Sequence, residues 1–189
     1  MTSLSYALFN MVVNFAMLLI FIRFMLQFAG LERNHPYVQP AYKATQIVDV
    51  FGRIFPTVGG GRVNLAAVML LFLLKLIDIS GNAAIAGHGY TPIRLFFEGT
   101  LSLILSFLSV ARYLIIGSII ISWIVVFTQK MHPIFELIVQ MAEPILAPFR
   151  RITPNLGMLD LSPMVAIFGL LLIEIFVEII ARNLLPMIG

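Results

Sequence analysis

Residues 141–164 read MAEPILAPFRRITPNLGMLDLSPM and stand between two of the longest apolar runs in the chain. The stretch carries two adjacent arginines, Arg150 and Arg151, and four prolines. Charged residues are rare within hydrocarbon, and proline interrupts helices, so the stretch is expected to separate two apolar segments. It predicts a loop at a membrane surface, and the rest of the chain decides how many spans surround it.

The composition of the chain excludes an ordinary soluble domain. Apolar residues make up 60% and charged residues 11% of the 189 residues, and the mean hydropathy is +1.02. Soluble domains use roughly 25% charged residues, so we predict an integral membrane protein. The basic residues are spread thinly at the ends of apolar runs, which indicates topology signals and no nucleic-acid partner. Because the chain has no cysteine, disulfides, thiolate catalysis and cysteine-ligated zinc are excluded.

Four apolar segments are long enough to cross a bilayer. They cover residues 4–29, 63–86, 101–128 and 163–186, and roughly 20 apolar residues suffice for a helical span. Ahead of the third segment, residues 87–100 form the connection on the outer side, where Thr91 can cap a helix and Pro92 suits its first turn. We therefore predict an all-α membrane protein with four transmembrane helices and a short separate helix in this outer connection.

Basic residues concentrate in the two long loops, residues 30–62 and 129–162. The N-terminal tail has no lysine or arginine, and the middle loop has only Arg94. The long loops hold seven basic residues: Arg33, Lys43, Arg53, Arg62, Lys130, Arg150 and Arg151. By the positive-inside rule, both long loops are predicted to be cytoplasmic and both termini to lie outside.

The opening stretch has an earlier counterpart at an offset of 98 residues, where FGRIFPTVGG (51–60) aligns with FRRITPNLGM (149–158). Each copy follows a His-Pro dipeptide and precedes an apolar span, and the aligned identities are Phe51, Arg53, Ile54, Pro56 and Gly59 with Phe149, Arg151, Ile152, Pro154 and Gly157. Each copy holds an even number of spans, so both copies face the same way. We predict two parallel helical-hairpin repeats, residues 1–86 and 101–189, related by a pseudo-two-fold axis along the membrane normal.

Residues 134–149 place apolar side chains at helical spacing, which predicts an amphipathic helix lying at the cytoplasmic membrane interface. Pro144 and Pro148 each remove a backbone donor, so we expect them to interrupt or kink this helix. The helix would deliver Arg150 and Arg151 to a turn at the interface. Asp160 or Ser162 would then cap the fourth span.

The motif EPILAPFRRITPNLGMLDLSP closely resembles the signature of the YggT family, also called YlmG-related, and the resemblance covers essentially the whole chain. The first copy departs from the motif, because Gly52 replaces one arginine and Arg62 stands where Asp160 stands. The resemblance implies a multi-pass protein of the bacterial plasma (inner) membrane. The resemblance links the protein to relatives associated with osmotic or ionic stress, with cell division and, in photosynthetic lineages, with cytochrome assembly. It implies no catalytic residue.

Three readings stay open for Arg53, Arg150 and Arg151. Guanidinium groups match phosphate geometry, so these arginines could bind anionic lipid headgroups. They could instead mark orientation and pair with Asp160, or dock a partner protein.

Five charged residues fall inside the predicted spans: Lys75, Asp78, Arg112, Glu174 and Glu178. Lys75 and Glu174 each lie about 18 Å from the cytoplasmic start of their helices, so a pair across the bundle is geometrically allowed. We expect the polar stripes of the second and fourth spans to meet at the pseudo-symmetry axis, and Arg23 to snorkel to the cytoplasmic surface. Such charges hold a bundle together, form an ion or proton pathway, or contact a cofactor or partner.

The histidines give no sign of a metal or haem site. His35, His88 and His132 are dispersed along the chain, and no Ser-His-Asp arrangement is present, so we expect no enzyme activity, metal or cofactor. The first hypothesis is a non-enzymatic scaffold, assembly or stress-response protein whose arginine-proline loops engage anionic lipid, other membrane proteins or further copies of itself. The alternative is a small oligomeric ion channel or transporter involved in osmotic or ionic homeostasis.

Overall fold

The computed structural model describes residues 2–153 and 160–188, and four long helices dominate that part of the chain. They are α1 (Thr2–Phe28), α4 (Leu65–Ala86), α5 (Pro92–Thr128) and α7 (Ser162–Leu184). By length and composition, all four can cross a membrane. The prediction of a mainly helical protein with four apolar spans is thereby confirmed.

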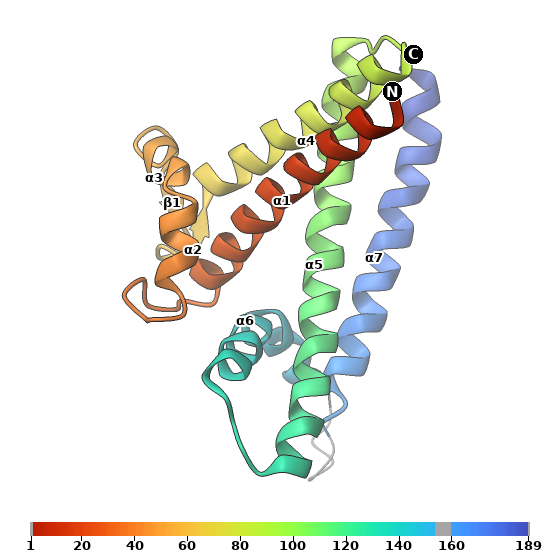
Figure 1. The fold of residues 1–189 in the computed structure, drawn as a ribbon. Coiled ribbons are helices and arrows are strands. Elements are labelled where there is room, and N and C mark those ends of the chain that lie inside the picture. Colours follow the sequence, from red (N-terminus) through yellow and green to blue (C-terminus); the bar gives the residue numbers. More distant parts are fainter. Residues whose placement is uncertain (1, 154–159, 189) are drawn as a thin grey trace.

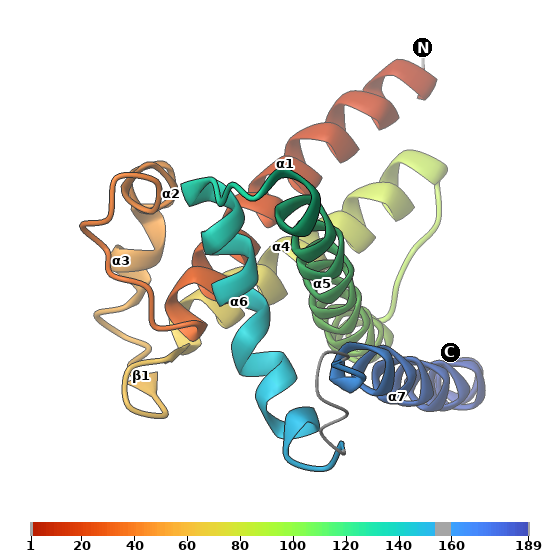
Figure 2. The ribbon, with the colours of Figure 1, turned by 90° about the horizontal axis from the view of Figure 1, so that it is seen from below.

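The long helices form two pairs, α1 with α4 and α5 with α7, as Figure 1 shows. Within each pair the helices run in opposite directions, so the start of α1, the α4–α5 connection and the end of α7 all lie at the same end of the molecule (Figure 1). The pairs diverge away from that end. Helix α5 packs against both α4 and α7, and it lies between them in the view of Figure 2.

Aromatic packing joins α1 to α5 at the centre of the molecule. The ring of Phe107 lies 4.9 Å from that of Phe21 and 5.1 Å from that of Phe24, both in edge-to-face geometry. Nearer the start of α1, Phe9 lies so close to Gly81 of α4 that a side chain at residue 81 would clash with its ring. Close approach at this glycine brings the first pair of helices together.

The helix expected as a separate element in residues 87–100 is continuous with the third span. Helix α5 begins at Pro92. The preceding residue, Thr91, caps it by accepting a hydrogen bond from the backbone N–H of Arg94 at 3.4 Å. Arg94 and Glu98, one turn apart, form an ion pair at 3.7 Å. No helix breaker separates these residues from the span, because Gly99 is tolerated where its lack of a side chain admits Leu76 of α4.

The first long loop contains two short helices and a small hairpin that the sequence did not predict. The helices are α2 (Gln39–Ala44) and α3 (Ile47–Phe51), and the strands are β1 (Thr57–Val58) and β2 (Val63–Asn64). The strands pair antiparallel through Thr57–Asn64 and Val58–Val63. Gly59, Gly60 and Gly61 form the turn with φ of 63°, 68° and 86°, values that favour glycine. Asn64 then caps α4 by accepting a hydrogen bond from the backbone N–H of Ala67 at 3.0 Å.

The second long loop is dominated by α6 (Pro133–Arg150), which runs through Pro144 and Pro148. The prolines were expected to interrupt or kink the helix, and the interruption is not found. Each proline removes one intrahelical hydrogen bond, but burial of Ala142 and Leu146 against α5 and α7 favours the helix. The predicted turn at residues 154–159 lies outside the described residues, and α7 ends in a 3-10 turn, η1 (Leu185–Met187).

Candidate functional site

The most buried charged side chain in the described residues is Arg23, near the end of α1, with 2% of its surface exposed. Its guanidinium donates to the carbonyl of Thr45 at 2.6 Å and to Asp49 Oδ1 at 2.5 Å. The expectation that Arg23 snorkels to the surface was therefore wrong. Thr45 stands at the break between α2 and α3, where its carbonyl also accepts a hydrogen bond from the backbone N–H of Val48 at 3.0 Å, and Asp49 supplies the opposing charge.

Arg33 and Tyr42 complete this first arginine cluster. Arg33 Nη2 lies 2.9 Å from Asp49 Oδ2, and the ring of Tyr42 lies 4.6 Å from the guanidinium of Arg23 and 5.1 Å from that of Arg33. Burial raises the pKa of Asp49, but the hydrogen bonds and charges of Arg23 and Arg33 outweigh it and set the pKa below its ordinary value. Burial raises the pKa of Tyr42. Asp49 is therefore an ionised acceptor between two cations at neutral pH.

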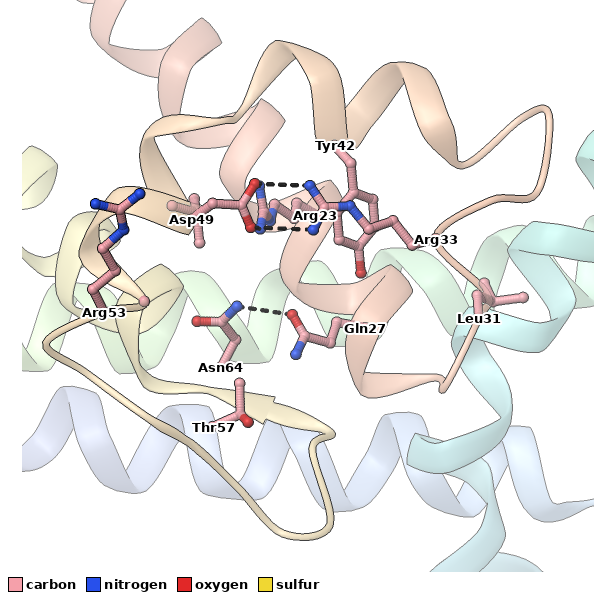
Figure 3. A pocket seen from close by; sticks show the side chains of 11 residues that line it. Arg23, Gln27, Leu31, Arg33, Tyr42, Asp49, Arg53, Thr57 and Asn64 are labelled. Atoms are coloured by element: carbon pink, nitrogen blue, oxygen red, sulfur yellow. Dashed lines mark hydrogen bonds and ion pairs between the residues drawn. The ribbon is translucent and has the colours of Figure 1, made fainter.

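An open pocket of about 430 Å³ lies beside this cluster (Figure 3). A hydrogen bond of 2.8 Å from Asn64 to Gln27 forms part of its wall, and Arg53 stands at one side of it. Arg53 is exposed, and no carboxylate in the described residues pairs with it. Sequence reasoning selected Arg53 but missed Arg33 and Asp49. The sequence contained one signal for an Arg23–Asp49 pair, because Asp49 is one of only two acidic residues in the loop at residues 30–62 and the span before that loop contains Arg23.

Arg150 forms a second arginine cluster at the end of α6. Its Nη1 lies 2.5 Å and 2.6 Å from the two carboxylate oxygens of Glu143, and its Nε lies 3.2 Å from Asp160 Oδ2. The Arg150–Asp160 pair is one of the readings that the sequence left open. Hydrogen bonds from Ser162 lower the pKa of Asp160, and the charge of Arg150 adds to this effect although partial burial opposes it. All three ion-pairing side chains are between 43% and 48% exposed.

Lys75 and Asp78 close on each other within α4, at 3.2 Å between Nζ and Oδ2. Asp78 also accepts a hydrogen bond from Asn82 at 3.0 Å, and Asn82 exchanges two hydrogen bonds with Asn10 of α1. The polar stripe of the second span therefore faces α1. The Lys75–Glu174 pair that depth alone allowed is not formed.

Glu174 of α7 pairs instead with Arg112 of α5, and both side chains are less than one fifth exposed. Glu178 lies one turn further along α7 and pairs within that helix with Arg182, at 3.5 Å. The two polar stripes thus face different partners and do not meet on one axis. The physical reason is that α5 lies between α4 and α7 (Figure 2).

A comparison with known protein families adds a second kind of observation. A sequence model of the CCB3/YggT family matches residues 2–81 and 97–181. The chain belongs to the CCB3/YggT family. The matched segments include both arginine clusters. They also include the Lys75–Asp78 and Arg112–Glu174 pairs.

Several relatives of this CCB3/YggT protein come from bacteria. It is 32% identical over 176 residues to the uncharacterized protein PA0392 of Pseudomonas aeruginosa, which covers 92% of this chain and 86% of that one. It is 32% identical over 173 residues to an uncharacterized protein of Vibrio alginolyticus, covering 90% of both chains. The uncharacterized protein YggT of Escherichia coli is 26% identical over 175 residues, covering 92% of this chain and 88% of that one. No solved structure matches the chain.

A second pocket of this CCB3/YggT protein, about 330 Å³ in volume, lies near the α4–α5 connection. Asp78, His88, Tyr90 and Glu98 are among its lining residues, and Tyr90 donates a hydrogen bond to Glu98 at 3.2 Å. Burial raises the pKa of Tyr90, and the charge of Glu98 adds to the increase. Within the described residues, no group of three or more histidine, aspartate or glutamate side chains is arranged to hold a metal ion.

Proposed function

We propose that this protein is a non-enzymatic scaffold or assembly protein of the bacterial inner membrane, whose two arginine-bearing loops engage anionic lipid and partner proteins. The observation that carries the proposal is the state of Arg53 and Arg151. Both are exposed, and within residues 2–153 and 160–188 neither is paired with a carboxylate. A guanidinium without an internal partner is available to a lipid phosphate or to an acidic partner surface.

The proposal places both loops in the cytoplasm and both termini outside. The positive-inside rule supports this orientation, because seven basic residues lie in the loops at residues 30–62 and 129–162. A parallel internal repeat is part of the same proposal. Its support is the agreement of the 98-residue offset with the similar direction of the pairs α1–α4 and α5–α7 (Figure 1).

The intramembrane charges support a scaffold more than a conduction pathway. Glu174 neutralises Arg112, and Asp78 neutralises Lys75. The charges in each pair therefore balance one another in the low-dielectric interior, and no mobile ion is needed. An oligomeric ion channel or transporter is the second candidate. The observation in its favour is the pocket that exposes Asp78 and Glu98 near the α4–α5 connection.

Lipid selectivity in reconstituted membranes tests the proposal. Spin-labelled phosphatidylglycerol and phosphatidylcholine are compared for their association with the full chain by electron paramagnetic resonance. We expect the wild type to prefer phosphatidylglycerol and Arg150→Ala with Arg151→Ala to lose much of that preference, because each basic residue near an anionic surface contributes about 1 kcal/mol, or about fivefold. Arg94→Ala with Arg182→Ala is the matched control, since it removes two arginines at the other end of the molecule. Equal association of both lipids with the wild type would contradict the proposal.

The channel alternative has its own test. Wild-type protein in sealed vesicles would show cation or anion flux that Glu174→Gln abolishes. We expect no flux above that of protein-free vesicles, and flux that depends on Glu174 would replace the scaffold proposal.

A further inference from the structure

The pocket beside the first arginine cluster has a chemistry of its own. We propose that it binds one phosphate group, in a site formed by Arg33 and Arg53 over the buried Arg23. The inference deepens the proposed function by naming a ligand and a place for it. It does not depend on Arg150 or Arg151, which lie in the second loop.

The charge balance of the pocket favours an anion. Its charged lining residues are Arg23, Arg33, Arg53 and Asp49, so three positive charges face one negative charge. Asp49 is already shared between Arg23 and Arg33, at 2.5 Å and 2.9 Å. Two guanidinium groups on one carboxylate reduce its repulsion of a second anion, and the charge of Arg53 stays uncompensated within the described residues.

The buried base of the site also has a hydrogen-bond donor to spare. Arg23 is 2% exposed, yet its Nε has no acceptor within hydrogen-bond distance among residues 2–153 and 160–188. Thr45, Asp49 and the Tyr42 ring hold the guanidinium in place. A fixed cation at the base lowers the ordering entropy that binding has to overcome, and Arg33, 58% exposed and held by Asp49 at 2.9 Å, already stands beside the pocket.

The size and surroundings of the pocket match a lipid headgroup. A volume of about 430 Å³ lies within the range of small-molecule sites and exceeds what a single phosphate ion fills. On the other face of the same segment from the pocket-lining Val48, Asp49 and Gly52, α3 and the turn after it expose Ile47, Val50 and Ile54, with 51%, 55% and 74% of their surfaces accessible. A short helix with an exposed apolar face and an arginine-lined pocket on its other face suits a segment at headgroup depth in a membrane.

Equilibrium binding to the full chain in a neutral detergent tests this site. Three probes are titrated: dihexanoyl phosphatidylglycerol, dihexanoyl phosphatidylcholine and inorganic phosphate. We expect saturable binding of one phosphatidylglycerol per chain, with phosphatidylcholine at least about tenfold weaker because its choline cation opposes the arginines. Arg53→Gln and Arg33→Gln should each weaken phosphatidylglycerol binding about tenfold or more, in line with hydrogen bonds to charged groups.

Lys43→Gln is the matched control, because Lys43 lies on α2, is exposed and does not line the pocket. It should change binding by less than about twofold, as expected for a surface charge outside the site. Inorganic phosphate binding as tightly as phosphatidylglycerol would also support the site and would identify its ligand as a free phosphate.

Equal loss of binding in Lys43→Gln and Arg53→Gln would overturn the inference, because it would show general charge attraction. Absence of saturable binding by the folded wild type, or equal affinity for both lipids, would overturn it as well. Arg150→Ala with Arg151→Ala should retain this binding. Failure of the pocket and failure of the loop-based proposal are therefore distinguishable.

Discussion

The two arginine clusters both contain arginine–carboxylate ion pairs, but the arginine is buried in the first cluster and exposed in the second. Arg23 is 2% exposed and ties α1 to α3, whereas Arg150 is 43% exposed and ties the end of α6 to Glu143 and to Asp160 just before α7. A buried cation cannot leave its carboxylate without a large desolvation penalty, but an exposed cation can exchange its carboxylate for a phosphate. The comparison teaches that the first cluster fixes the fold, and that the second is suited to contact with lipid or partner.

The largest expected effect comes from Arg23→Ala. It removes the buried partner of the Arg23–Asp49 pair together with its hydrogen bond to the Thr45 carbonyl, so we expect a loss of about 3 kcal/mol of folding free energy. Arg150→Ala should lose about 1 kcal/mol or less, because its pairs are exposed. Thermal unfolding of both variants in detergent measures the difference. Equal losses would remove the distinction between the clusters.

A smaller effect is expected within the spans, where Arg112 and Glu174 resemble the buried cluster. Glu174→Gln leaves Arg112 without an opposing charge and should destabilise by about 2 kcal/mol, within the range for hydrogen bonds to charged groups. Arg112→Leu with Glu174→Leu should restore much of that loss, because it removes both charges together. The same unfolding measurement tests this pair. A double variant less stable than Glu174→Gln would show that the pair contributes more than mutual neutralisation.

Acid should weaken the first cluster in a defined direction. The arginines set the pKa of Asp49 below its unfolded value, so its stabilising contribution is complete above the unfolded pKa of about 4 and is lost as pH falls through the lower folded pKa. Melting temperatures measured from pH 6 downward should therefore fall more steeply for the wild type than for Asp49→Asn. Parallel curves would mean that Asp49 does not control the acid response.

The smallest effect on stability is expected for Arg151→Ala. Arg151 is exposed and unpaired within the described residues, so the free energy of unfolding should change by about 0.5 kcal/mol or less. Its association with spin-labelled phosphatidylglycerol should nevertheless decrease. A stable variant with unchanged lipid preference would restrict the contact to Arg150.

The spans and their caps were predictable because they depend on local sequence. Apolar length located α1, α4, α5 and α7, and side-chain chemistry located the cap at Thr91. The partners of the buried charges depend on how the helix pairs diverge, and hydropathy carries no information on that geometry. Depth therefore allowed Lys75 with Glu174, while the structure pairs Arg112 with Glu174.

The first arginine cluster was missed for a related reason. Arg23 was expected to snorkel. The sequence does not show that the chain breaks at Thr45 between α2 and α3, or that Asp49 of α3 then lies 2.5 Å from Arg23. The hairpin at residues 57–64 was not predicted, since two-residue strands are too short to give an alternating pattern. The prolines of α6 show tertiary burial overriding local propensity.

Lipid selectivity measured on one panel of reconstituted proteins tests the central claim most directly. The panel is the wild type, Arg150→Ala with Arg151→Ala, and Glu174→Gln. The account predicts that Glu174→Gln keeps the preference for spin-labelled phosphatidylglycerol over phosphatidylcholine and that the double arginine variant loses most of it. A double arginine variant that stays folded and keeps the wild-type preference, while Glu174→Gln loses it, would contradict the account.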